Sequence, residues 1–152
     1  MGAAVDGDGG RLVLGGAAVT SFAVFLGVLR ATLRREEGEA GALSATAVIA
    51  GSVVAAGALV AVALDLPEAR VALAFPTAAL VLASSAAILW TGALDRIAGY
   101  AGIAVVLLQL PAGASVAEEG AFSPDGMVPT VARVAFLGWI ALASVTILRH
   151  PS

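Results

Sequence analysis

The sequence predicts an all-α fold, an integral membrane bundle of five transmembrane helices. Hydrophobic residues make up 60% of the chain and charged residues 12%, and the mean hydropathy is +1.00. A soluble domain carries about 25% charged residues, so this chain has too little polar surface to face water. Its 152 residues divide into five apolar runs separated by polar connectors. We therefore expect residues 1–152 to form a single transmembrane domain.

The expected helices cover residues 12–34, 43–64, 71–90, 97–113 and 130–148. A span needs about 20 apolar residues to cross a hydrocarbon core of about 30 Å, which puts the fourth segment at the lower limit. The N-terminus before the first segment is acidic and glycine-rich. A secretory signal would begin with basic residues, so the first segment is expected to stay as a membrane helix.

The first two segments each carry small residues at helical spacing. In the first segment the series is Gly16, Thr20, Ala23 and Gly27; in the second it is Ala47, Gly51, Ala55 and Ala58. Small residues on one helical face let another helix approach closely in a membrane. Alanine and glycine are so common here that chance is the alternative explanation. Ser44 is the expected N-cap of the second segment.

The last three segments begin or end with recognisable signals. Pro76 lies near the start of the third segment, where it can kink the helix. Trp90 at its far end fits the aromatic belt of a membrane interface. Asp95 is the expected cap of the fourth segment, and Ala98 and Gly102 form a small-xxx-small pair within it. Ser84 and Ser85 stand mid-helix and are expected to bond the preceding turn.

The arginines predict the orientation. Five spans put the connector at residues 30–39, the connector near Asp95 and the C-terminus on one side, which holds five arginines: Arg30, Arg34, Arg35, Arg96 and Arg149. The other side holds Arg11 and Arg70, with Arg133 just inside the fifth segment. By the positive-inside rule the first side is cytoplasmic. The prediction is an N-terminus outside and a C-terminus inside a bacterial inner (plasma) membrane.

Four residues are candidates for polar contacts inside the membrane: Gln109, Arg133, Ser84 and Ser85. Polar and ionisable groups at membrane depth are the default functional candidates. We expect Gln109 to bond a neighbouring helix, with a substrate contact as the alternative. We expect Arg133 to reach the interface through its long stem, or to pair with Glu118 or Glu119, with a buried ligand-binding role as the alternative.

The residues give no catalytic, cofactor-binding or metal site, so we expect neither an enzyme nor a cofactor. The chain has no cysteine, and its one histidine, His150, has no companions for a metal site. Serine nucleophiles lack a histidine within the fold to act as base. The few arginines form no extended basic face, so no nucleic-acid partner is expected. The absence of lysine and the heavy use of alanine, glycine and valine suggest a GC-rich bacterial genome.

Three stretches carry a resemblance that spans most of the chain: residues 29–38, residues 91–102 and residues 138–149. With them the chain resembles a loose group of small, uncharacterised multi-pass membrane proteins from GC-rich bacteria, labelled as a domain of unknown function. In that group the hairpin commonly reads Gly-Ala-Leu-Pro-Arg-Trp and continues through a second Trp. Here Asp95 replaces the proline, and Ile97 and Tyr100 replace the tryptophans. The resemblance implies a multi-pass membrane fold and no particular activity, ligand or site.

The expected function is non-catalytic: an interaction, assembly or envelope-associated membrane protein. Its expected surroundings are the lipid bilayer, with a second copy or a partner membrane protein docked through the small-residue faces. The alternative is a small transporter or channel-like protein that acts as an oligomer. A transporter should show a polar cavity at membrane depth, whereas an interaction protein should expose small residues that its own fold leaves unpacked.

Overall fold

The computed structural model describes residues 4–38, 41–64, 71–114, 120, 121, 123 and 126–149. The described chain is all-α, which confirms the predicted fold class. Its five long helices are α1 (Ala4–Glu37), α2 (Ala42–Ala63), α4 (Ala74–Thr91), α5 (Arg96–Gly113) and α6 (Met127–Arg149). All five are long and apolar enough to cross a membrane. The largest difference from the predicted bounds is α1, which begins eight residues early because the glycines at its start do not stop the helix.

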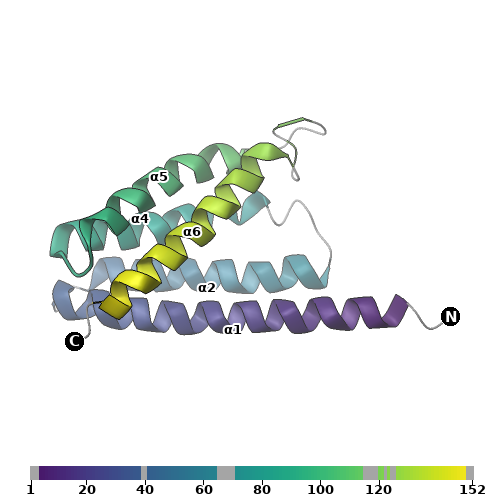
Figure 1. The fold of residues 1–152 in the computed structure, drawn as a ribbon, viewed down its shortest axis with the longest axis horizontal. Coiled ribbons are helices and arrows are strands. Elements are labelled where there is room, and N and C mark those ends of the chain that lie inside the picture. The colour runs from purple at the N-terminus through teal and green to yellow at the C-terminus, as the bar shows by residue number, and fades with distance from the viewer. Residues whose placement is uncertain are drawn as a thin grey trace.

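Helix α4 lies in the middle of the bundle. Helices α1 and α2 pack side by side as an antiparallel pair, α2 packs on α4, α4 on α5, and α5 on α6 (Figure 1). Within the membrane-spanning windows, 56% of the residues of α4 are buried, against 11% for α1. Helix α4 is therefore surrounded by its neighbours, while α1 keeps most of its circumference outside.

A row of aromatic rings joins α1 to α6. The rings of Phe22 and Phe136 lie 6.2 Å apart, and those of Phe25 and Trp139 lie 6.3 Å apart, both edge to face. Pairs of this geometry contribute about 0.5–1.5 kcal/mol beyond the area they bury. Helices α1 and α6 have few other contacts. This row of rings is therefore the main contact between the first and the last helix.

The connection from α1 to α2 is capped differently from the prediction. Ser44 is not the N-cap: Gly41 takes that place in the left-handed conformation, with φ of 43°. The backbone N–H of Ser44 instead donates to both carboxylate oxygens of Glu37, each at 3.1 Å. A carboxylate there satisfies an open helix N–H and faces the positive end of the helix dipole. The Glu37 carboxylate therefore stabilises the turn between α1 and α2.

The starts of α5 and α4 both carry a residue that the sequence singled out. Asp95 is the N-cap of α5, and its side chain accepts from the N–H of Ile97 at 3.0 Å. Pro76 is only the third residue of α4. Residues 71 and 72 are also helical, and a turn at Leu73 separates them from α4. The interruption lies within one turn before Pro76, where a proline disturbs a helix.

The bundle presents an apolar surface. Val13 is 71% exposed, Leu14 73% and Leu148 80%. Trp90 and Tyr100 are also exposed, at the bundle end that carries the arginines at the close of α1. Exposing this much apolar area costs free energy in water and not in lipid. The exposed shell and the five long helices together indicate a membrane protein in a lipid bilayer.

Candidate functional site

The centre of the bundle is a closed seam between α4, α5 and α6. Ser85 is fully buried in it, and Trp139 is 2% exposed. The indole N–H of Trp139 donates to the carbonyl of Ala98 at 3.0 Å, which fastens α6 to α5. A methyl group added at Gly102 would collide with the Ser85 hydroxyl and come within 2.8 Å of the indole nitrogen. At Gly102 the backbone of α5 therefore lies directly against the side chains of α4 and α6.

The two serines behave differently, and one of them departs from the prediction. The Ser84 hydroxyl donates to the carbonyl of Leu80 at 2.8 Å, as expected. The Ser85 hydroxyl, expected to do the same, has no hydrogen-bond partner in the described part of the chain. An unmade hydrogen bond on a buried hydroxyl costs about 1–3 kcal/mol. With no base hydrogen-bonded to its oxygen among the described residues, Ser85 is not arranged as a nucleophile.

Gln109 and Arg133 line the same groove, to which α1, α2, α4, α5 and α6 all contribute residues. Gln109 is 4% exposed, and its side-chain N–H donates to the carbonyl of Ala132 at 3.2 Å. This bond spans from α5 to α6, as predicted for a membrane-buried amide. The adjacent Arg133 is partly buried, and Glu118 and Glu119, its predicted partners, lie outside the described residues. Thr77 of α4 completes the polar end, with its hydroxyl donating to the carbonyl of Leu73 at 2.7 Å.

This groove consists of two cavities, of about 600 and 470 Å³. The larger contains Gln109, Arg133 and Thr77; the smaller continues along α6 to Ile140 and Ser144. Five apolar residues line both: Ala18, Val54, Ala58, Phe136 and Leu137. We call the combined cavity the lateral groove. It is polar at one end and apolar along the rest of its length.

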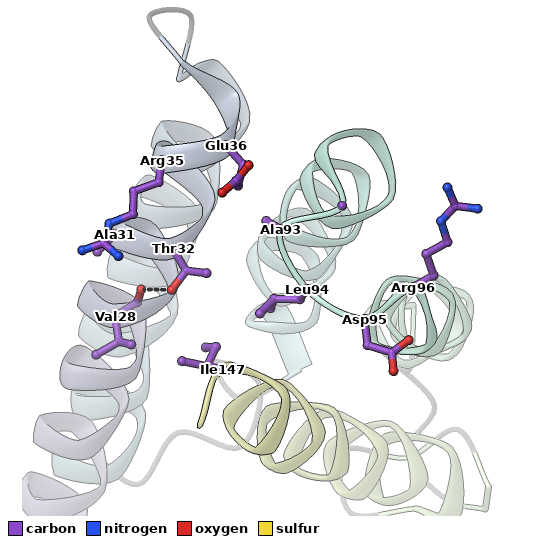
Figure 2. A pocket seen from close by; sticks show the side chains of 11 residues that line it. Val28, Ala31, Thr32, Arg35, Glu36, Ala93, Leu94, Asp95, Arg96 and Ile147 are labelled. Carbon is purple, nitrogen blue, oxygen red and sulfur yellow. Dashed lines mark hydrogen bonds between the residues drawn. The ribbon is translucent and has the colours of Figure 1, made fainter. Parts of the chain in front are cut away.

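A third cavity, of about 820 Å³, lies at the bundle end where α1 finishes (Figure 2). The end of α1, the α4–α5 connector and Ile147 of α6 surround it. Figure 2 shows Glu36 turned toward the connector, while the guanidinium groups of Arg35 and Arg96 point away from the gap. The Thr32 hydroxyl donates to the carbonyl of Val28 at 3.1 Å. The lining of this cavity therefore mixes apolar and charged residues, and its charged groups do not point toward one another.

The described residues contain no group of three or more His, Cys, Asp or Glu side chains that could hold a metal ion.

Sequence reasoning missed Trp139 as an internal donor. The available signal was its position: it stands mid-span, whereas tryptophans of the aromatic belt stand at span ends. The sequence identified Gln109 and Arg133, at the polar end of the lateral groove, as separate candidates. It could not show that they lie together, because the approach of α5 to α6 is a tertiary contact.

Comparisons with protein-family models, with curated proteins and with solved structures found no match to this chain.

We predict that Gln109 acts through its bond to α6. Replacing Gln109 by Met keeps the size of the side chain and removes the donor, and it should lower the free energy of unfolding by about 1 kcal/mol. The measurement is denaturation in mixed detergent micelles. Leu108→Met, at a partly exposed neighbouring position on α5, is the matched control and should change nothing. Equal stability of the Gln109→Met protein and the unmodified protein would refute the structural role.

Proposed function

We propose that this chain is a non-catalytic interaction or assembly protein of a bacterial inner membrane, and that α1 supplies its docking surface. The observation that carries the proposal is the exposure of α1, the least buried of the five spans at 11%. Its buried side chains, among those described, are Leu26, Leu29 and Leu33. All three lie in the second half of the helix, so most of α1 faces lipid.

The exposed side of α1 carries the small residues Gly16, Thr20, Ala23 and Gly27, which we call the α1 face. A methyl group added at Gly16 or Gly27 would meet nothing within 4 Å. Two glycines of other helices are covered, since Gly51 lies against Leu26 and Gly102 lies against Ser85, whereas Gly138 of α6 is open like those of α1. Since lipid offers no hydrophobic force between helices, close approach over small residues drives their association. Such a face left open in the single chain favours docking of another membrane helix.

The charge at the end of the α1 face favours a partner of a different sequence. Arg30 and Arg34 continue the series at spacings of three and four residues after Gly27. Copies of one chain insert in the same direction, so a second copy on this face would bring like charges together. Each arginine pair at 4 Å would cost about 1–4 kcal/mol. A partner helix with Asp or Glu at that end would remove this cost.

The orientation is part of the proposal. Arg34 and Arg35 occupy the last turn of α1, Arg96 begins α5 and Arg149 ends α6. These positions fall at one end of the five alternating helices, and by the positive-inside rule that end is cytoplasmic. The arginine-only basic composition fits a GC-rich bacterial genome.

The channel-like alternative would have to use an oligomer. The lateral groove places Gln109, Thr77 and Arg133 at membrane depth, which favours this alternative. In the single chain, however, Ser85 and Trp139 are buried and lie close to the backbone at Gly102, which argues against a pore along this seam. Affinity capture from native membranes separates the two functions. A channel of this kind would be isolated with copies of itself alone.

We predict that affinity capture of the tagged protein from native membranes isolates a second membrane protein. Gly16→Leu should reduce its recovery about tenfold, since about 1.4 kcal/mol of lost packing is a tenfold change in binding. Ala17→Leu is the matched control: it adds a leucine at the next exposed position, about one-quarter turn off the face, and should keep the partner. Capture of the chain alone or with copies of itself, or equal effects of the two variants, would refute the α1 face as the docking surface.

We predict that a membrane-impermeant maleimide, added to intact cells, labels Ala121→Cys and leaves Glu36→Cys unlabelled. Both positions are exposed, and the chain has no other cysteine. After the cells are opened both variants should react, which verifies that the thiol introduced at position 36 is reachable. Labelling of position 36 in intact cells, or none at position 121, would reverse the proposed orientation.

A further inference from the structure

We propose that the lateral groove is a binding site for one anionic phospholipid of the surrounding bilayer. One acyl chain of this lipid lies along the groove, and its phosphate is bound by Arg133. The inference is independent of the proposed function: α1 lines the groove through residues such as Ala18 and Phe22, and none of the α1-face residues lines it.

The shape of the groove fits a thin apolar chain. Along α6 the lining runs from Pro129 to Ser144, a length of about 22 Å at 1.5 Å per residue. This is somewhat longer than half of the hydrocarbon core, which is about 15 Å. An acyl chain whose head group lies at the membrane surface could therefore follow the groove through a whole leaflet.

The volume argues against a protein helix as the occupant. A helix with a diameter of about 10 Å would need about 1,700 Å³ over a length of about 22 Å. The two cavities measure about 600 and 470 Å³ and share part of their lining. A helix would have to remain largely outside, whereas an extended acyl chain can lie between the small side chains of Ala18 and Ala58 and the larger Phe136 and Leu137.

The charge of the groove selects an anionic head group. Among the described residues, Arg133 is the only charged one in the lining, and no carboxylate lines the groove. The residue is the seventh of α6, about 9 Å from the helix start. Its stem can lift the guanidinium toward the level of lipid phosphates.

The neighbouring polar groups suit a shared head-group site. A guanidinium has five N–H donors in a planar fork that matches phosphate oxygens, so it can serve protein and lipid acceptors together. Thr77 and the buried Gln109 give the same end of the groove further polar surface. The apolar remainder of the lining offers nothing to a second charged group, which limits the site to one head.

The test is a titration of the detergent-purified full chain with phosphatidylglycerol or phosphatidylcholine of identical acyl chains, with bound lipid read by native mass spectrometry. The unmodified protein should bind the first phosphatidylglycerol about tenfold more tightly, because the trimethylammonium group of phosphatidylcholine leaves that head group without net charge and is repelled by Arg133. Arg133→Gln should abolish this preference, and Arg133→Lys should keep part of it. Arg149→Gln, at the other end of the same helix, is the matched control and should keep all of it.

A second variant tests the acyl chain independently of the charge. Ala58→Phe places a ring in the stretch shared by both cavities, and it should weaken binding of both lipids about equally. An unmodified protein without preference, or a preference that survives in Arg133→Gln, would overturn the head-group assignment. Unchanged lipid binding in Ala58→Phe would overturn the groove, and so would a spectrum in which a second chain replaces the lipid.

Discussion

The close approach of α4 and α5 at Gly102 is the contact on which the rest of the bundle depends. With no side chain at Gly102, α5 comes near enough for Ser85 to lie against its backbone, and Trp139 of α6 then reaches the carbonyl of Ala98 at 3.0 Å. In lipid, apolar surface gains nothing by moving from tails to protein, so such contacts have to supply the association energy. The seam orders α4, α5 and α6 and positions Gln109 beside Ala132.

The consequence for the other two helices is an uneven distribution of contacts. Helix α2 packs on α4, and α1 packs on α2 where Leu26 lies against Gly51, while the aromatic row from Phe22 to Trp139 joins α1 to α6. The lateral groove, to which all five helices contribute residues, remains open, and the outer face of α1 remains unpacked. The same geometry thus leaves two different surfaces, a narrow groove for a lipid chain and a broad helical face for a partner.

The fold class could be predicted because apolar length and arginine-bearing connectors are local properties of the sequence. The caps show how far this extends: Asp95 was predicted correctly from its position before a helix, whereas Ser44 was not the cap, because Glu37 and the left-handed Gly41 occupy that role. The small-residue faces were visible in the sequence, but which stayed open was not. Gly51 and Gly102 are covered and Gly16 and Gly27 are free only because of the order in which the helices pack. The groove joining Gln109 to Arg133 required the same tertiary information.

The central claim is that Gly102 lies in the closed seam while Gly27 lies on an open face, and one comparison tests it directly. The free energy of unfolding would be measured for Gly102→Ala and Gly27→Ala in the same detergent. The account predicts that Gly102→Ala loses about 1–3 kcal/mol through overpacking. It predicts that Gly27→Ala stays unchanged or gains up to about 1 kcal/mol, because alanine is the better helix former. Equal losses in the two variants, or no loss in Gly102→Ala, would contradict it.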